Sequence, residues 1–140
     1  MTRPYFAYGA NLDRAAMARR CPGARVRQRA VLADHALVAM REGWLSIAPR
    51  PGSQVEGLLW ELDPEHLIAL DEYEEVASGL YVHEMRAVEI IDGTCVEALV
   101  YVGENAGPGR LHGEYADRVA RAARAELGPA AAGTIEALAR

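Results

Sequence analysis

Carboxylate side chains crowd together in one short stretch, residues 71–75, where Asp71, Glu72, Glu74 and Glu75 surround a single tyrosine. Apolar residues flank the stretch on both sides. Like charges close together and an apolar setting both raise the pKa of a carboxyl group toward the range that suits proton transfer near neutral pH. The stretch therefore contains a candidate general acid or base. The alternative interpretation is an acidic helix end that is exposed to solvent.

A second candidate is the junction at residues 8–12, which reads Tyr-Gly-Ala-Asn-Leu. Glycine allows a tight turn there, and the free N–H groups at the start of a helix form a ready site for a carboxylate or an oxyanion. The other reading of the junction is a capped helix with no ligand. The junction and the acidic stretch are the two segments of the chain that could carry chemistry.

The remaining reactive side chains match no catalytic or metal-binding spacing. The four histidines fit no helical metal motif, and no serine lies in a G-x-S-x-G nucleophile turn. All 15 basic residues are Arg, which excludes a lysine Schiff base and the P-loop lysine. Cys21 and Cys95 are too few for a disulfide framework or an all-cysteine zinc site. We therefore expect neither a metal nor a cofactor.

The junction is expected to lie between a strand and a helix. Residues 4–8 are apolar and aromatic enough for a short strand, which Gly9 ends. Asn11 is a suitable N-cap for a helix over residues 12–20, and Pro22 stops that helix.

Strands dominate the middle of the chain. Runs rich in Val, Leu and Trp, separated by turn sequences, predict three strands at residues 30–40, 44–48 and 55–62. Asp92-Gly93 is the strongest hairpin signal in the chain, and it predicts paired strands at residues 81–91 and 95–102. These strands are expected to form a sheet or a barrel.

Two further helices frame these strands. Asp63 as N-cap and Pro64 at the first helical position begin a short helix that ends in the acidic stretch. Helical spacing of apolar residues predicts a second helix over residues 115–127, stopped by Gly128 and the proline after it. The glycine-rich loop 103–109 before it is expected to be mobile and to act as a lid. The fold class is α+β.

Composition favours one domain over residues 1–140, because the hydrophobic content is 51% and no linker divides the chain. A net charge of -5 argues against nucleic acid as a partner, and the six arginines between positions 14 and 29 are interpreted as a solvated face. No run of about 20 apolar residues and no secretory leader is seen. We therefore expect a soluble, cytoplasmic protein without a membrane partner.

Four segments, taken in chain order, carry a recognisable set of patterns. Residues 5–12 read Tyr-Phe-Ala-Tyr-Gly-Ala-Asn-Leu, and residues 51–60 are a Pro-Gly turn followed by a Val-containing strand ending in Trp. Residues 70–81 hold Leu-Asp-x-x-Glu and then Ser-Gly-x-Tyr. A tyrosine, a pair of small residues and a proline follow at seven-residue intervals from Tyr115 to Pro129. Together they resemble the gamma-glutamylcyclotransferase family, the AIG2-like group, over nearly the whole chain.

The resemblance implies a small mixed β-barrel or strongly curved sheet with helices packed outside. It also implies the family's reaction, in which the α-amine of a γ-glutamyl amide attacks the γ-carbonyl. This cleavage releases 5-oxoproline and a free amine or amino acid. The reaction requires no protein nucleophile, metal or cofactor. The expected partner is a small γ-glutamyl molecule, and the chain is expected to be a monomer or a homodimer.

The resemblance also assigns residues. The family's catalytic carboxylate, the general acid and base, falls on Glu74. The substrate-binding positions fall on Tyr5, Tyr8, Gly9, Ala10, Asn11, Tyr81 and Tyr115.

Two residues depart from the family pattern: Ala10 stands where a serine is usual, and Glu75 stands where a glycine is usual. The loss of the serine hydroxyl removes one hydrogen bond but leaves the backbone N–H of Ala10 in place. The alternative function is therefore a non-catalytic small-molecule-binding domain of the same fold, and Glu74 is the residue that discriminates between the two.

Overall fold

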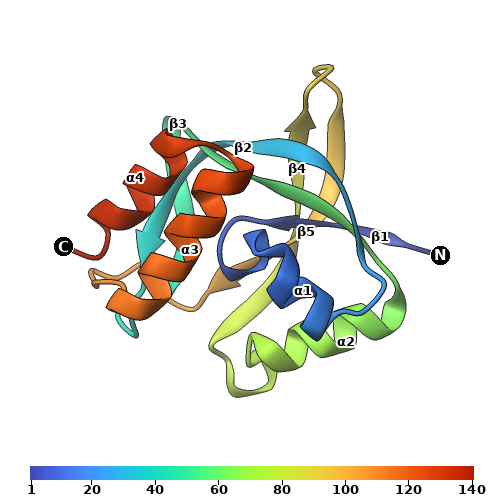
Figure 1. The fold of residues 1–140 in the computed structure, drawn as a ribbon, viewed down its shortest axis with the longest axis horizontal. Helices are drawn as coiled ribbons and strands as arrows, with labels where there is room; N and C mark the ends of the chain where they lie inside the picture. Colours follow the sequence, from blue (N-terminus) through green and yellow to red (C-terminus); the bar gives the residue numbers. More distant parts are fainter.

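The computed structural model describes residues 1–140 and consists of five strands, four α-helices and two short 3-10 turns (Figure 1). The strands are β1 (Arg3–Ala7), β2 (Arg25–Ala39), β3 (Leu45–Leu62), β4 (Tyr81–Ile90) and β5 (Cys95–Gly103). The helices are α1 (Arg14–Arg20), α2 (Pro64–Tyr73), α3 (Gly113–Glu126) and α4 (Pro129–Ala137), and the 3-10 turns are η1 (Ala10–Leu12) and η2 (Val76–Ser78).

The five strands form a closed barrel in the order β1-β3-β2-β4-β5. The pairs β1–β3, β2–β3, β2–β4 and β4–β5 are antiparallel, whereas β1 and β5 are parallel and meet at the pair Tyr5 and Leu99. The helices lie outside the barrel, with α3 and α4 side by side on one flank and α1 and α2 near each other (Figure 1). The expected α+β fold, a small mixed barrel with helices outside, is confirmed.

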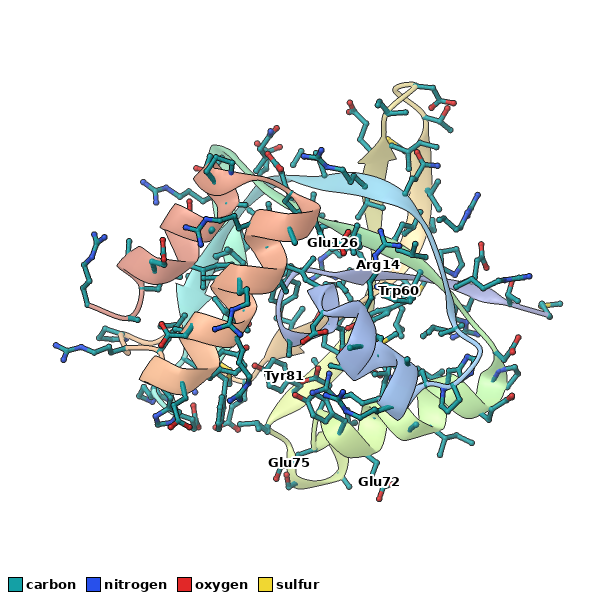
Figure 2. All side chains as sticks on the ribbon, viewed as in Figure 1. Arg14, Trp60, Glu72, Glu75, Tyr81 and Glu126 are labelled. Atoms are coloured by element: carbon teal, nitrogen blue, oxygen red, sulfur yellow. The ribbon has the colours of Figure 1, made fainter.

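The barrel and the inner face of α3 share one hydrophobic core of 33 buried residues. The helix face consists of Ala116, Val119, Ala120 and Ala123, whose 3.6-residue spacing places small side chains against the barrel. Arg14 of α1 and Glu126 at the end of α3 form a two-pronged ion pair, with nitrogen–oxygen distances of 2.8 and 2.9 Å (Figure 2). This ion pair joins α1 to α3. None of the helices has the length and apolar character needed to cross a bilayer.

The junction differs from the prediction in where its helix begins. Asn11 is part of the 3-10 turn η1, and α1 begins only at Arg14. Asp13 caps this helix, because its carboxylate accepts hydrogen bonds from the amides of Ala15 and Ala16 at 3.0 and 3.2 Å. The prediction that Asn11 is the N-cap is therefore wrong, and the Asn11 side chain is free to point inward.

The two strands predicted at 44–48 and 55–62 are one continuous strand, β3. Between the pairs Ala33–Gln54 and His35–Pro49, β3 has four residues, numbers 50–53, where β2 has only Asp34, so β3 bulges out of the ladder. Asp34 has a φ of 58° and accepts a hydrogen bond from the Gly52 amide at 3.0 Å. A bulge tolerates prolines because the ladder is already interrupted there. The proline and glycine residues thus produce an irregularity within one strand instead of a turn between two strands.

Two predictions near the C-terminal half are also corrected. Gly128 and Pro129 end one helix but also begin α4, for which Pro129 occupies the first turn. The loop 103–109 is attached to the β2–β3 turn through Asn105, whose side chain accepts from the Arg41 amide and donates to the Glu42 carboxylate, both at 2.8 Å. The glycines allow close backbone approach, and no residue of the loop lines the cavity that contains Glu74. The prediction that the loop is a lid over the site is therefore wrong.

Candidate functional site

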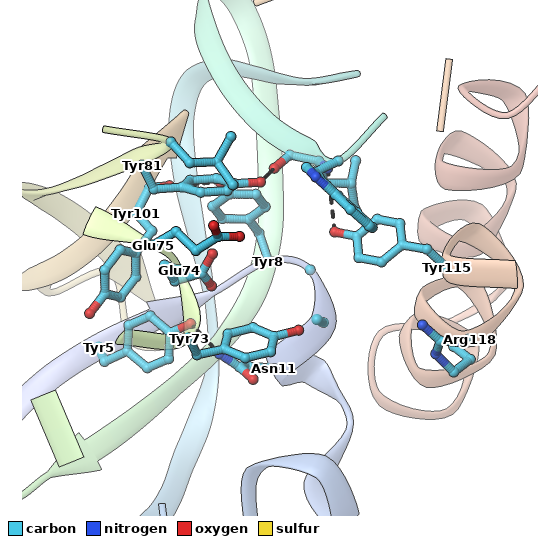
Figure 3. Close-up of a pocket in the computed structure, with 15 residues that line it drawn as sticks. Tyr5, Tyr8, Asn11, Tyr73, Glu74, Glu75, Tyr81, Tyr101, Tyr115 and Arg118 are labelled. Carbon is cyan, nitrogen blue, oxygen red and sulfur yellow. Dashed lines mark hydrogen bonds between the residues drawn. The ribbon is translucent and has the colours of Figure 1, made fainter. Parts of the chain in front are cut away.

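A cavity of about 280 Å³ opens between the barrel and α3 (Figure 3). The junction after β1, the start of β3, the turn after α2 and the start of β4 all contribute to its wall. All the residues expected at the site line it, namely Glu74, Tyr5, Tyr8, Gly9, Ala10, Asn11, Tyr81 and Tyr115. The two segments that the sequence singled out therefore meet in one cavity.

Glu74 is partly buried in the wall of this cavity, at the C-terminal end of α2. Burial raises the pKa of its carboxyl group to about 7, and the nearby positive charge of Arg20 opposes that rise. No side chain or amide of the protein donates a hydrogen bond to the carboxylate. Both of its oxygens are thus available to a ligand, and both protonation states are populated near neutral pH.

The turn after Glu74 depends on an unusual backbone conformation at Glu75, which has a φ of 54° and a ψ of 46°. The reversal is held by the Glu75 carbonyl, which accepts hydrogen bonds from the amides of Ser78 and Leu80 at 3.2 Å. This left-handed conformation is one that glycine adopts without strain. It explains in physical terms why the family pattern has glycine at this position.

Three of the cavity's tyrosines already use their hydroxyl protons. Tyr8 donates to the carbonyl oxygen of Tyr101 at 2.6 Å, and Tyr81 donates to the carbonyl oxygen of Leu45. Tyr101 donates to the carboxylate of Asp71 at 2.6 Å, and that same oxygen lies 2.8 Å from Nδ1 of His83. These three rings are walls of the cavity whose orientation the protein fixes.

The other three tyrosines of the cavity accept hydrogen bonds and keep a proton to donate. One of them is Tyr73, whose hydroxyl accepts from the guanidinium of Arg20 at 2.9 Å. The Tyr5 hydroxyl accepts from the side-chain amide of Asn11 at 2.9 Å, and the Tyr115 hydroxyl accepts from the backbone amide of Leu45 at 3.3 Å. The amide of Gly9 donates to no other group of the protein. The cavity wall therefore offers at least four free donors, which suits a ligand that carries a carboxylate or a polarised carbonyl.

Asn11 lies in the cavity wall but has partners of its own. Its side chain is buried, donates to Tyr5 and accepts from the guanidinium of Arg20 at 2.6 Å. Arg20 also stacks on the Tyr73 ring, with 3.8 Å between its guanidinium carbon and the ring centroid. Asn11 thus fixes the positions of Tyr5 and Arg20 as well as facing the cavity.

Several residues that line the cavity were not predicted at the site: Trp44, Leu45, Tyr73, Glu75, Leu80, Tyr101 and Arg118. Arg20, which was interpreted as part of a solvated face, lies beside the cavity. The signal for Arg20 was helical spacing, because it follows the buried residues Ala16 and Met17 by four and three positions. The same kind of signal marks Arg118, which follows Tyr115 by three positions on α3 and so lies on the same face of that helix.

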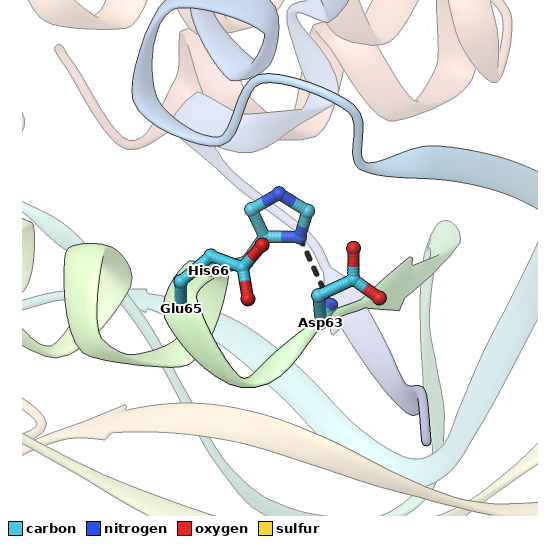
Figure 4. Close-up of side chains that lie close together, drawn as sticks. All are labelled: Asp63, Glu65 and His66. Carbon is cyan, nitrogen blue, oxygen red and sulfur yellow. Dashed lines mark hydrogen bonds between the residues drawn. The ribbon is translucent and has the colours of Figure 1, made fainter.

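A cluster of Asp63, Glu65 and His66 at the start of α2 has the ligand types of a metal site (Figure 4). Both ring nitrogens of His66 are already used. Nδ1 accepts a hydrogen bond from the Asp63 amide at 2.9 Å, and Nε2 lies 2.6 Å from the Pro22 carbonyl oxygen, to which it donates. The cluster holds the start of the helix, and the histidine has no lone pair left for an ion.

The fold and the site define a small closed-barrel protein with a tyrosine-lined cavity around one carboxylate. The family model for gamma-glutamyl cyclotransferase, AIG2-like, matches residues 5–119. The chain belongs to this family.

Individual relatives agree with the family match. The chain is 34% identical to a gamma-glutamylcyclotransferase of Mus musculus over 74% of its own length, and the match spans 62% of the mouse protein. Among solved structures, a gamma-glutamyl cyclotransferase superimposes with a TM-score of 0.86 at 26% identity, covering 99% of this chain and 86% of that one. An uncharacterized protein from Homo sapiens gives a TM-score of 0.87 at 26% identity, over 97% and 87% of the two chains.

Proposed function

We propose that this protein is a cyclotransferase that cleaves a γ-glutamyl amide. The α-amine nitrogen of the glutamyl group attacks its own γ-carbonyl carbon, so that a carbon–nitrogen bond forms and closes the ring. The original amide bond breaks, and 5-oxoproline and an amine or amino acid leave. Because the nucleophile belongs to the substrate, the protein's task is to fold the glutamyl chain into a reactive geometry and to carry protons from the attacking nitrogen to the departing one.

Glu74 carries these protons in this proposal. An α-ammonium group has a pKa of roughly 8, so it must be deprotonated before it attacks. A carboxylate whose pKa is raised to about 7 is a base of nearly matching strength. The attacking nitrogen loses two protons on its way from ammonium to lactam N–H, one before it attacks and one as the ring closes. Glu74 accepts each in turn and passes it to the departing nitrogen, which leaves as an ammonium group, so no net proton is gained or lost by the protein.

The free donors hold the substrate while this happens. The Gly9 amide and the Tyr5 and Tyr115 hydroxyls can bind the glutamyl carboxylate and the oxyanion that develops on the γ-carbonyl. Ala10 supplies no hydroxyl, so at this turn the substrate is bound by backbone amides alone. We further propose that residues 1–140 act as one domain and work without a cofactor.

The observation that carries the proposal is a carboxylate with a raised pKa and free oxygens in the same cavity as the junction after β1. The test is mass spectrometry of 5-oxoproline release from a panel of γ-glutamyl peptides and γ-glutamyl amines. Glu74→Gln should abolish release and retain substrate binding, because the amide keeps the shape but cannot carry a proton. Glu72→Gln is the matched control, since Glu72 is exposed and does not line the cavity.

Binding without any release of 5-oxoproline by the unaltered protein would refute the cyclotransferase and support the second candidate, a non-catalytic binding domain. The observation that favours this candidate is Ala10, which removes a hydroxyl from the substrate-binding turn. Full turnover by Glu74→Gln would show that another group moves the proton.

A further inference from the structure

A smaller hollow of about 70 Å³ adjoins the main cavity. The two share a border made by Ala10, Tyr73, Tyr115 and Arg118, each of which lines both. In Figure 3, Tyr115 and Arg118 of α3 lie on the side of the cavity away from Glu74. A ligand that fills the cavity beside Glu74 and is longer than a glutamyl group can therefore extend toward this hollow.

The hollow carries an excess of positive charge. Arg19, Arg20 and Arg118 line it together with a single acid, Asp13. The Asp13 carboxylate is engaged at the start of α1, and no carboxylate lies within ion-pair distance of the three arginines. The positive charges of the hollow are thus not paired with an acid inside it. The guanidinium of Arg118 is available to an anion from outside the protein, whereas Arg20, whose two terminal nitrogens donate to Asn11 and Tyr73, adds a fixed charge.

The hollow is also partly organised in advance. Arg20 is held by the hydrogen bonds that it donates to Asn11 and to the Tyr73 hydroxyl and by its position over the Tyr73 ring, so ordering it on binding requires little further loss of side-chain freedom. Arg118 is exposed at the rim and makes no hydrogen bond to the protein. One arginine therefore provides a fixed positive charge, and the other can close over a ligand as it enters.

We infer that this hollow binds a carboxylate on the leaving group, so that Arg118 and Arg20 select γ-glutamyl amino acids or peptides over γ-glutamyl amines. The inference rests on the proposed function for the orientation of the substrate. The glutamyl carboxylate is bound deeper, near the Gly9 amide and the Tyr5 hydroxyl. The departing nitrogen lies at Glu74, and the group attached to it runs past Tyr73 and Tyr115 to the arginines.

The test compares γ-glutamyl-L-alanine with γ-glutamylethylamine, which differ only in the leaving-group carboxylate. The unaltered protein should prefer the alanine compound by about 10-fold or more in kcat/KM, and Arg118→Gln should reduce that ratio by about 10-fold, as for a lost hydrogen bond between charged groups. Arg121→Gln is the matched control, because Arg121 is an exposed arginine of the same helix outside both hollows. Arg118→Lys should restore part of the ratio.

A binding measurement separates this inference from the proposed function. The dissociation constants of the two compounds for the Glu74→Gln protein should show the same preference, and Arg118→Gln in that background should remove it. This readout stands even if the unaltered protein releases no 5-oxoproline. Equal losses for both compounds on changing Arg118 would overturn the inference, because they would place the glutamyl carboxylate at the arginines. An unchanged preference would overturn it as well.

Discussion

At the scale of single residues, the chemistry of Glu74 acts against the stability of the fold. Burial raises its pKa from the ordinary 4.5 to about 7, so the folded protein holds a proton that the unfolded chain releases between these values. Stability is therefore highest at low pH as far as this group is concerned. It falls as the pH rises from about 4.5 to 7, because ionising a buried carboxyl is unfavourable.

The first prediction is that Glu74→Gln stabilises the protein at pH 8 by up to about 3 kcal/mol, since each unit of pKa shift corresponds to about 1.4 kcal/mol. Most of that gain should disappear at pH 5, where the native carboxyl is still protonated. Urea unfolding at both pH values measures it. Glu72→Gln, at an exposed position, should show no such pH-dependent gain. Equal stabilities of Glu74→Gln and the unaltered protein at pH 8 would contradict the account.

Glu75 carries a different kind of strain, in the backbone. A left-handed conformation disfavours any residue with a Cβ by about 1–2 kcal/mol, whereas glycine loses about 0.5–1 kcal/mol in chain entropy. We therefore predict that Glu75→Gly raises the free energy of unfolding by about 0.5–1 kcal/mol, measured by urea denaturation.

The control for Glu75→Gly is Glu72→Gly, three residues earlier and inside α2. Glycine in a helix interior is unfavourable by about 1 kcal/mol, so this change should lower stability. If both substitutions destabilise the protein, the left-handed conformation at Glu75 is not a source of strain.

At the scale of elements, the sequence predicts best where local chemistry and tertiary structure agree. The hairpin at Asp92-Gly93 and the start of α2 at Pro64 are found as expected, because turn dihedrals and capping are local properties. Asn11 and the prolines of β3 were misread, since Asp13 is an equally good cap and a bulge uses the same residues as a turn. At such positions the local sequence allows two structures, and only contacts with distant parts of the chain select one of them.

The site was predicted in part for the same reason. The residues of two short motifs line one cavity, whereas Arg118 and Trp44 reach it only because α3 packs beside the start of β3. Trp44 contacts the Tyr115 ring edge-on, at 5.1 Å between centroids. A contact between residues 71 positions apart leaves no local trace in the sequence.

The contact between α3 and β3 leads to the third prediction, which concerns Tyr115→Phe. The change removes the acceptor of the Leu45 amide and one free donor of the cavity. The kcat/KM for γ-glutamyl substrates should fall by about 10-fold or more, as for a hydrogen bond to a charged group. Stability should fall by only about 1 kcal/mol, the usual contribution of one hydrogen bond. Steady-state kinetics and urea unfolding of the same sample measure both effects.

A result in which Tyr115→Phe loses stability but keeps its kcat/KM would assign the ring to the core alone. Tyr81→Phe is a useful comparison, because the Tyr81 hydroxyl proton is already donated to a backbone carbonyl. Tyr81→Phe should therefore lower stability more than it weakens substrate binding.

At the scale of the whole molecule, the site depends on how β1 is held in the barrel. This strand lies between β3 and β5, and its C-terminal end leads directly into the junction that carries Gly9. Five residue pairs join β1 to β3, and one pair joins it to β5. The position of the junction relative to Glu74 is therefore set chiefly by the contact between β1 and β3.

Gly57 of β3 lies against the end of β1 with no room for a side chain, which leads to the last prediction. A Cβ at this position would clash with the Ala7 carbonyl oxygen and lie 2.7 Å from the Phe6 ring, and neither backbone nor buried ring can move freely. Gly57→Ala should therefore destabilise the protein by about 2–3 kcal/mol and displace β1.

The matched control for Gly57→Ala is Gly133→Ala in α4, where there is open space at Cβ and stability should rise by about 1 kcal/mol. Urea unfolding of both variants measures these changes, and kcat/KM should fall only for Gly57→Ala, because the displaced strand carries the Gly9 amide away from Glu74. A Gly57→Ala protein of unaltered stability and activity would mean that the barrel does not fix the site in this way.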